Sequence, residues 1–126
     1  SQVAAKLVKS RRNLETSIKN EKNAALLNHE NIVCILGIEE GKAWSLITME
    51  LCGTSLQDKL NDTGLDRAER INTWRAMCCA LEFCHNAGIV HADVKPKNVL
   101  IGAHGQPKLA DFGSSVVIGE RSTNLR

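Results

Sequence analysis

The sequence has no long run of apolar residues. Its longest apolar stretch spans residues 76–81, far short of the roughly 20 residues that a membrane-spanning helix needs. The first twelve residues lack the apolar core and the small-residue cleavage site of a signal peptide. We therefore expect neither a membrane span nor a secretory signal in this chain.

The sequence also lacks an excess of charge of one sign. Its 16 basic and 14 acidic side chains leave a formal net charge of +2. No basic run supplies the patch that an electrostatically driven nucleic-acid binder needs, so no nucleic-acid partner is expected. Of the 126 residues, 43% are hydrophobic and 24% are charged. This balance excludes a disordered chain, a coiled coil and a collagen-like repeat, and it suits one ordinary domain.

The cysteines do not form the pattern of a disulfide framework. There are five of them, an odd number, and two are adjacent in sequence. Without a secretory signal, this pattern favours a reducing compartment, and we expect a cytoplasmic location. Cys79, Cys84 and His85 leave zinc as an alternative, but no second ligand pair stands at finger-like spacing. Packing of the cysteines as small hydrophobic residues is the preferred interpretation.

The apolar periodicity changes several times along the chain and predicts a mixture of strands and helices. The expected strands span residues 2–8, 32–38, 44–51, 89–90, 99–101 and 108–110, and the expected helices span about 12–27, 56–60 and 66–86. Thr54 or Ser55 is expected to cap the short helix, with Asp58 as its partner in a capping box. A small β-rich part is thus followed by a mostly helical part, with a break at Cys52-Gly53. A cleft between two such parts is a natural ligand site.

The long helix carries an apolar stripe of Ile71, Trp74, Cys78 and Leu81. We expect this stripe to face the core, and we expect Trp74 to be a core residue rather than a platform for a ligand. Gly88 is placed to end the helix.

Glu21 interrupts an otherwise apolar stripe on the first helix. A carboxylate taken out of water without a partner costs several kcal/mol, so a buried Glu21 needs a cation. Lys6, on the strand face that also carries Ala4, is the candidate cation. The stripe alone leaves two alternatives about equally open, a Glu21 exposed to solvent and a Glu21 paired with Lys6.

Residues 91–98 carry the densest chemistry of the sequence. They hold the carboxylate of Asp93, the amine of Lys95 and the amide of Asn98, and a second carboxylate, Asp111, stands eighteen residues after Asp93. Asn98 and Asp111 supply the oxygen ligands that Mg²⁺ takes while substrate phosphates remain in its shell. Asp93 is left to accept the proton of an attacking hydroxyl. Lys95 can neutralise charge on a transferring phosphoryl group.

These residues resemble the catalytic loop and the metal-binding motif of eukaryotic protein kinases, whose patterns are H-R-D-x-K-x-x-N and D-F-G. Lys6 matches the strand lysine of the V-A-x-K motif, and Glu21 matches the helix glutamate that pairs with it. Residues 29–33 resemble the H-x-N-I-V segment, and residues 49–52 resemble the gatekeeper and the hinge. The resemblance extends from residue 2 to about residue 118.

The resemblance implies a serine/threonine protein kinase that uses ATP and Mg²⁺ and acts on a protein substrate, since a lysine two residues after Asp93 is the serine/threonine form of the loop. It implies that Asp93 is the catalytic base, that Lys95 steadies the γ-phosphoryl group, and that Asn98 and Asp111 bind the metal. The residues that it implies at the ATP site are Lys6, Glu21, Ala4, Met49, Glu50, Cys52 and Leu100. In this pattern the backbone N–H of Cys52 binds adenine, and Leu100 lies under the base opposite Ala4.

The implied fold is an α+β, two-lobed protein-kinase fold, of which the chain is a part. That part runs from the third strand of the small lobe to just past the D-F-G motif. We expect residues 1–51 to belong to the small lobe, 52–53 to form the hinge, and 54–126 to begin the large lobe. An incomplete kinase fragment without activity is therefore one alternative.

Ala92 departs from the common pattern, because most kinases have an arginine before the catalytic aspartate. That arginine holds a phosphorylated activation loop through charge-assisted hydrogen bonds, which alanine cannot make. A pseudokinase that acts as a scaffold is a second alternative. Among kinases without this arginine, the chain is most similar to the Mos family, also through Arg11-Arg12, the hinge that closes on Gly53, and Ser115. This similarity implies activation of the mitogen-activated protein kinase cascade in meiotic maturation, with a mitogen-activated protein kinase kinase as substrate.

Overall fold

The structure is a computed structural model, and it describes residues 2–9 and 14–119. Its elements in chain order are β1 (Val3–Lys9), α1 (Leu14–Ala24), β2 (Ile35–Glu40), β3 (Trp44–Glu50), α2 (Leu56–Asp62), α3 (Arg67–Asn86), β4 (Ile89–Val90), the 3₁₀ turn η1 (Pro96–Asn98), β5 (Val99–Ile101), β6 (Pro107–Leu109) and β7 (Val116–Val117). The expected α+β class is confirmed. The expected helix start at Arg12 and the Arg11-Arg12 pair lie outside the described residues.

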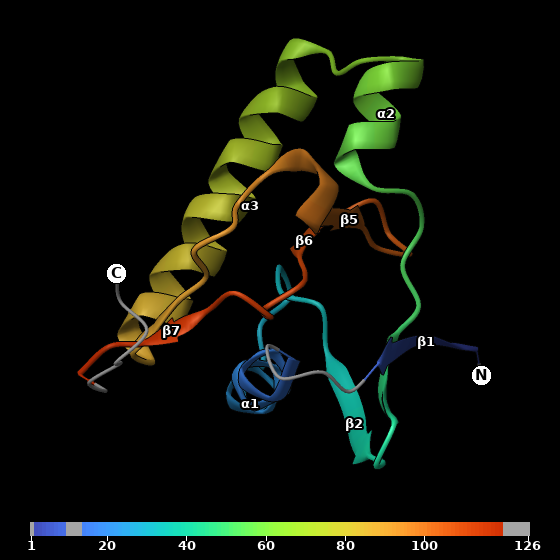
Figure 1. The fold of residues 1–126 in the computed structure, drawn as a ribbon. Helices are drawn as coiled ribbons and strands as arrows, with labels where there is room; N and C mark the ends of the chain where they lie inside the picture. Colours follow the sequence, from blue (N-terminus) through green and yellow to red (C-terminus); the bar gives the residue numbers. More distant parts are fainter. Residues whose placement is uncertain (1, 10–13, 120–126) are drawn as a thin grey trace.

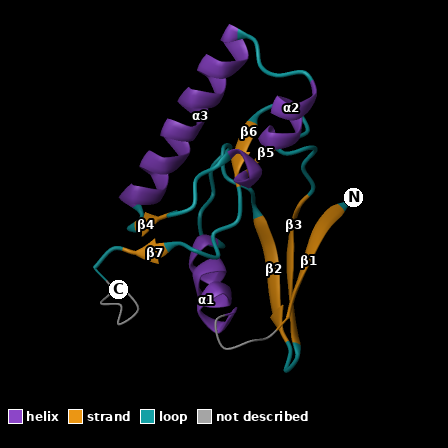
Figure 2. Cartoon of the chain, turned by 45° about the horizontal axis from the view of Figure 1, so that its top comes forward, coloured by secondary structure: helices purple, strands orange, loops and turns teal. Residues whose placement is uncertain are grey.

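The first part of the chain is an antiparallel sheet of three strands in the order β1-β3-β2, and α1 lies beside β2 (Figures 1 and 2). The predicted alternation of β1 is confirmed, because Ala4, Lys6 and Val8 are half-buried while Val3 and Leu7 are exposed. Successive side chains of a strand point to opposite faces. The Lys6 side chain is thereby placed on the inner face of the sheet.

Helix α1 buries Ile18, Glu21 and Ala24, which fall on one stripe at spacings of three residues. The expected stripe is confirmed at Ile18 and Glu21, whereas on the next turn Ala24 is buried and the expected Ala25 is half-buried. Glu21 is 4% exposed, and it is the only charged residue of this stripe among the described positions. Its burial excludes the alternative of a glutamate exposed to solvent.

Both helices after the break begin with side-chain caps. The Ser55 hydroxyl accepts the backbone N–H of Asp58 at 3.1 Å, and the Asp66 carboxylate accepts that of Glu69 at 2.8 Å, each within a capping box. Loss of such a cap costs about 1 kcal/mol. The predicted stop at Gly88 is also confirmed, because Gly88 follows α3 with a φ of 81° that glycine adopts without strain.

The predicted core stripe of α3 is wrong for three of its four residues, and the fourth, Leu81, packs against the core. Trp74 is 72% exposed, Ile71 is 41% exposed and Cys78 is exposed. The face that packs inward instead carries small residues at intervals of four, Ala76, Ala80 and Cys84, with Met77 and Leu81 beside it. Small side chains let the helix approach β6, whereas an indole at this contact would hold the two elements apart.

Two short strand pairs complete the fold. Strands β5 and β6 form the predicted hairpin, whose turn is closed by a hydrogen bond from the Gly102 N–H to the Gln106 carbonyl at 2.8 Å. Strands β4 and β7 also pair, although no strand was expected at the position of β7. Beside these pairs lies a core cluster that joins α1, α3, β4 and β6 to the segment after β6, made of Ala24, Leu27, Ile32, Ala80, Cys84, Ile89, Leu109 and Phe112.

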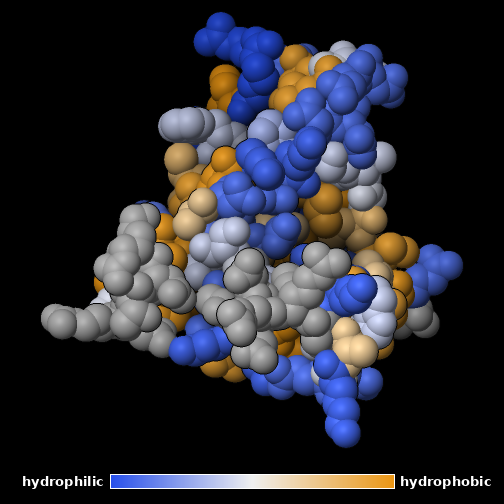
Figure 3. Space-filling model, viewed as in Figure 1, coloured by the Kyte–Doolittle hydropathy of each residue, from blue (hydrophilic) through white to orange (hydrophobic). Residues whose placement is uncertain are grey.

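The face drawn in Figure 3 has no large continuous hydrophobic patch. Its hydrophobic residues form several separate groups among hydrophilic ones. Within residues 2–9 and 14–119, no helix has the length and apolar character that crossing a membrane requires. All five cysteines have free thiols. Over the same residues, no group of three or more His, Cys, Asp and Glu side chains is arranged to hold a metal ion.

Candidate active site

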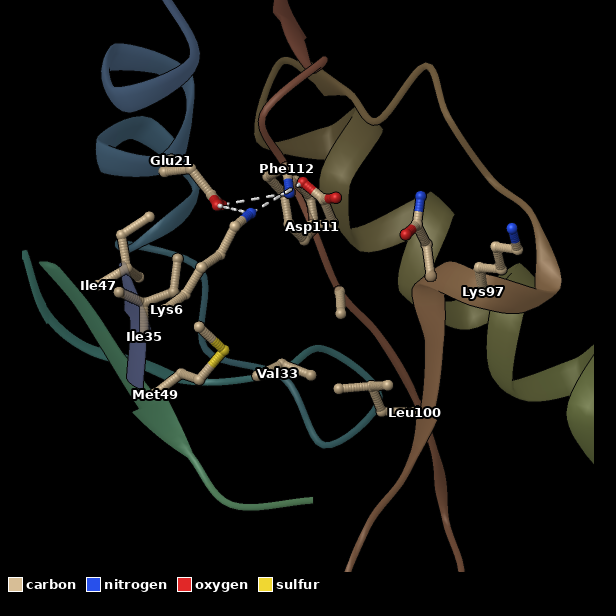
Figure 4. Close-up of a pocket in the computed structure, with 12 residues that line it drawn as sticks. Lys6, Glu21, Val33, Ile35, Ile47, Met49, Lys97, Leu100, Asp111 and Phe112 are labelled. Atoms are coloured by element: carbon tan, nitrogen blue, oxygen red, sulfur yellow. Dashed lines mark hydrogen bonds and ion pairs between the residues drawn. The ribbon is translucent and has the colours of Figure 1, made fainter. Parts of the chain in front are cut away.

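A cavity of about 270 Å³ opens between the three-stranded sheet, α1 and the β5–β6 hairpin (Figure 4). Its wall is mostly apolar on the sheet side and polar where α1 meets the segment after β6. The residues that line it are Lys6, Glu21, Val33, Ile35, Ile47, Met49, Lys97, Asn98, Leu100, Ala110, Asp111 and Phe112. Six of the residues predicted from the sequence are therefore in this wall, namely Lys6, Glu21, Met49, Asn98, Leu100 and Asp111.

The Lys6 ammonium lies between two carboxylates in the polar part of the cavity (Figure 4). Its Nζ is 3.7 Å from Glu21 Oε2 and 3.6 Å from Asp111 Oδ1. The predicted pairing of Lys6 with Glu21 is thus present. Lys6 and Asp111 keep 42% and 46% of their side-chain surface exposed, whereas Glu21 keeps 5%. The open side of this triad is therefore formed by a cation and one carboxylate.

Glu21 is held in a buried position by groups from two other segments, β1 and the residues after β6. Besides Lys6, its Oε1 accepts the backbone N–H of Phe112 at 3.2 Å. Burial nevertheless raises the pKa of the Glu21 carboxyl above its ordinary value, since desolvation outweighs the lowering effects of Lys6 and of the Phe112 N–H. The carboxylate of Asp111 adds to the increase.

The segment 111–113 is fixed from two sides. Asp111 has a φ of 59°, in the left-handed region that few residues other than glycine adopt. Its Oδ1 accepts the Gly113 N–H at 3.3 Å, and the Gly113 carbonyl accepts an N–H from the Asn20 side chain at 2.9 Å. The sequence analysis did not identify Asn20. Its only sequence signal is the position directly before Glu21, on the helix that faces this segment.

The predicted catalytic loop is tied together by Asn98. Its side-chain Nδ2 donates to the Asp93 carbonyl at 2.9 Å and to Asp93 Oδ2 at 3.1 Å. This arrangement uses the amide nitrogen and leaves the amide oxygen as the atom that can ligate a metal. Lys95 Nζ lies 3.7 Å from Asp93 Oδ2. Asp93 and Lys95 therefore lie together, although neither is part of the cavity wall.

His91 is a buried structural residue at the start of the catalytic loop. It is fully buried, its Nε2 lies 2.7 Å from the Ala110 carbonyl oxygen, and its Nδ1 accepts the Asp93 N–H at 3.1 Å. Its ring meets that of Phe112 edge to face at 4.7 Å. His91 thereby connects the start of the catalytic loop to the segment after β6. Between His91 and Asp93, Ala92 turns the chain with a φ of 70°.

The segment after β3 is positioned by its backbone. The Gly53 N–H donates to the Ile101 carbonyl at 2.6 Å, and the Ile101 N–H donates to the Thr54 carbonyl at 2.9 Å. Cys52 is half-buried, and burial, reinforced by the Glu50 carboxylate, raises the pKa of its thiol. Because a raised pKa lowers the fraction of thiolate, Cys52 has no sign of a reactive cysteine.

The Glu50 side chain is engaged away from the cavity. Its Oε2 accepts the Cys34 N–H at 2.7 Å, and its Oε1 lies 3.1 Å from Lys108 Nζ. Ala4, which stands opposite Met49 in the sheet, is likewise not part of the cavity wall. The expected ATP contacts of Ala4, Glu50 and Cys52 therefore remain predictions. They concern the backbone of these residues or the surface next to the cavity. The missed part of the wall is the set Val33, Ile35, Ile47, Lys97, Ala110 and Phe112.

The geometry of the site suits a phosphorylated ligand. A cavity with an apolar wall can hold a flat ring, and the Lys6 ammonium at its polar end can bind anionic oxygens. Asn98 and Asp111 bring side-chain oxygen atoms to the wall of the same cavity. The site therefore combines a cation for phosphate with oxygen donors for a hard metal ion.

Comparison with known proteins gives the same interpretation. The family model described as protein kinase domain matches residues 1–125. CBL-interacting serine/threonine-protein kinase 21 of Arabidopsis thaliana is 36% identical over 82% of this chain and 26% of its own length. Sperm motility kinase 2B of Mus musculus is 33% identical over 90% of this chain and 24% of its own. Serine/threonine-protein kinase mos of Patiria pectinifera is 38% identical over 82% of this chain and 31% of its own.

The chain therefore spans about a quarter to a third of the length of these curated relatives. Relatives of different names match it at similar identity, so the comparison does not select one of them. The family model covers nearly the whole chain. The chain belongs to the protein kinase domain family.

Proposed function

We propose that the chain is the nucleotide-binding and metal-binding part of a serine/threonine protein kinase, which transfers the γ-phosphoryl group of ATP to a protein serine or threonine. The observation that carries the proposal is the Lys6 ammonium held between Glu21 and Asp111 at the polar end of an apolar cavity. An apolar wall fits the adenine ring. The cation then faces the phosphates, where it neutralises charge.

Within this proposal, Glu21 holds Lys6 in place, and Lys6 orients the α and β phosphates. The donor set fits Mg²⁺, because Asn98 and Asp111 offer an amide oxygen and a carboxylate, and Asp111 is open to solvent on one side. When bound, Mg²⁺ would neutralise the phosphate oxygens and help to position them. Met49 and Leu100 contribute apolar wall to the ring pocket, next to the backbone of Glu50 and Cys52 and to Ala4.

Asp93 is the proposed base and Lys95 the proposed partner of the γ-phosphoryl group. Asp93 Oδ2 receives the Asn98 amide and lies near Lys95, so its orientation is fixed before a substrate arrives. A carboxylate held this way can orient a hydroxyl and accept its proton during transfer. The proposal assigns residues 1–51 to the small lobe, 52–53 to the hinge and 54–126 to the start of the large lobe.

The finer proposal is a Mos-like kinase of the cytoplasm, which phosphorylates a mitogen-activated protein kinase kinase during meiotic maturation. Its support is Ala92 in place of the usual arginine, together with a relative named serine/threonine-protein kinase mos. A whole protein that phosphorylates general kinase substrates but not a mitogen-activated protein kinase kinase would refute this finer proposal and leave the broader one standing.

The first experiment measures ATP binding to the chain by calorimetry, with and without Mg²⁺. Lys6→Met should abolish most of the affinity, and Asp111→Asn should abolish the gain from Mg²⁺. Lys22→Met is the matched control, because Lys22 also pairs with a carboxylate, Glu40, but on the exposed side of α1. An unchanged affinity in Lys6→Met would remove this lysine from the site.

The second experiment measures phosphoryl transfer by the whole protein. Asp93→Asn should lower the rate by about 10²–10⁴, the usual effect of losing a general base, while ATP binding persists. Binding of ATP without transfer by the unaltered protein would instead favour the alternative of a pseudokinase scaffold.

A further inference from the structure

Helix α1 contacts the segment 112–113 through two adjacent side chains. Glu21 Oε1 accepts the Phe112 N–H at 3.2 Å, and Asn20 Nδ2 donates to the Gly113 carbonyl at 2.9 Å. The N–H of Phe112 and the carbonyl of the next residue, Gly113, are thus both bound by one helix. The contact joins residues 93 positions apart in the sequence.

The same segment carries the Asp111 carboxylate. Gly113 donates its N–H to Asp111 Oδ1 at 3.3 Å, and Lys6 Nζ lies 3.6 Å from that oxygen. Asn20 therefore binds the carbonyl of Gly113, and the N–H of the same Gly113 binds the carboxylate of Asp111. Asp111 also has a φ of 59°, a conformation that costs about 1 kcal/mol or more for a residue other than glycine and persists only when its surroundings fix it.

We propose that Asn20 is a positioning residue, which acts through the Gly113 carbonyl to hold Asp111 in the orientation that binds Mg²⁺. Asn20 touches neither nucleotide nor metal in this account. Its amide keeps α1 and residues 111–113 in one register, so that Lys6, Glu21 and Asp111 meet at one point. The role rests on the proposed function, because it concerns the metal that Asp111 is proposed to bind.

A close approach at the same contact supports this role. A Cβ atom added to Gly113 would lie 2.7 Å from Ser17 Oγ, closer than real Cβ atoms come to other heavy atoms. Ser17 and Asn20 stand on neighbouring turns of α1. The segment therefore lies directly against this face of the helix, and the amide of Asn20 is the side-chain donor that reaches its backbone.

The test compares Asn20→Ala with Asn23→Ala, which makes the same change three residues further along α1. ATP affinity of the full chain is measured by calorimetry in EDTA and in saturating Mg²⁺. Asn20→Ala should reduce the gain in affinity from Mg²⁺ by about fivefold, the size expected for one hydrogen bond between neutral groups. Affinity in EDTA should stay within twofold, and Asn20→Gln should restore part of the gain because it retains the donor.

Amide hydrogen exchange supplies a readout that does not depend on the ligand. In Asn20→Ala, exchange at Phe112 and Gly113 should accelerate, while exchange in β6 should not, since β6 is held by its own pairing and by Asn31 and Val33. A merely structural role would weaken both affinities alike and would accelerate exchange in the core as well.

The outcomes separate this proposal from the one on which it rests. If the unaltered chain gains no affinity from Mg²⁺, the proposed metal function of Asp111 fails and the role of Asn20 fails with it. If the unaltered chain gains affinity and Asn20→Ala gains as much, only the role of Asn20 is refuted. Equal losses in Asn20→Ala and Asn23→Ala would also refute it, because the effect would then belong to the helix rather than to this contact.

Discussion

The pair of Glu50 and Lys108 offers the sharpest test of how the fold is held together. Lys108 on β6 keeps only 8% of its side chain exposed, and Glu50 on β3 keeps 30%. Their charged atoms lie 3.1 Å apart, and Glu50 also accepts the Cys34 N–H at 2.7 Å. The pair therefore joins the sheet to the hairpin that carries Leu100, and the two partners are unequally buried.

This inequality predicts unequal costs of substitution. Glu50→Ala leaves a nearly buried ammonium without a counterion and frees the Cys34 N–H, so it should destabilise the chain by about 3–5 kcal/mol. Lys108→Met keeps most of the buried chain length and leaves a carboxylate that is partly hydrated and still accepts the Cys34 N–H. Its cost should be about 1–2 kcal/mol, between the values of exposed and buried pairs.

The assay is urea denaturation of the chain, followed by the fluorescence of Trp44 and Trp74. The double variant Glu50→Gln with Lys108→Met removes both charges, and its amide can still accept the Cys34 N–H. It should be more stable than Glu50→Ala alone by about 2 kcal/mol, because no buried charge remains unpaired. If Lys108→Met costs as much as Glu50→Ala, or if the double variant is the least stable of the three, the burial argument is wrong.

Three further predictions concern the site. Because burial raises the pKa of Glu21, the contribution of this carboxyl to stability is present below the ordinary glutamate value of 4.5 and is lost as the pH rises through the raised folded value. The stability of Glu21→Gln should therefore increase relative to that of the unaltered chain over this pH range. A difference in denaturation midpoint that stays constant with pH would contradict this. Ala92 has a φ of 70°, which glycine adopts without strain, so Ala92→Gly should raise stability by up to about 1 kcal/mol and Ala92→Val should lower it. A lower melting temperature of Ala92→Gly would refute strain at this residue. Gly113→Ala should cost about 1–3 kcal/mol by overpacking against Ser17 Oγ, and Ser17→Ala should recover most of that loss in a double-mutant cycle, whereas additive effects would place the clash elsewhere.

The features that could be predicted from the sequence are those with a local or charge-based cause. The capping box at Ser55 and the stop at Gly88 depend on residues within a few positions of each other. The apolar stripe of the first helix left an exposed Glu21 and a Glu21 paired with Lys6 about equally open, and the resemblance to protein kinases favoured the pairing that the structure has.

The features that were missed depend on contacts distant in sequence. Hydrophobicity predicted that the face of α3 with Trp74 would be buried. In the structure, the face with Ala76, Ala80 and Cys84 packs closely against β6. Side-chain volume decides this contact more than hydrophobicity does, and a sequence pattern does not show which face meets a neighbour. The pairing of β4 with β7 rests on two residues in each strand, too few for any period to be visible.

Two of the three places where local rules fail, Glu21 and Asp111, lie together in the cavity wall, and the third, Ala92, lies in the catalytic loop. Ala92 and Asp111 are the residues other than glycine that have positive φ among the described positions, and Glu21 is a buried carboxylate whose pKa is raised. Each is unfavourable alone, and each is held by a partner from another segment: His91 next to Ala92 bonds the Ala110 carbonyl, and Lys6 lies between Glu21 and Asp111. The strain at Asp111 and the desolvation of Glu21 both lie at the polar end of one cavity, which fits a site that is organised before its ligand arrives. Relief of either should therefore make the chain more stable and its proposed ligands less tightly bound.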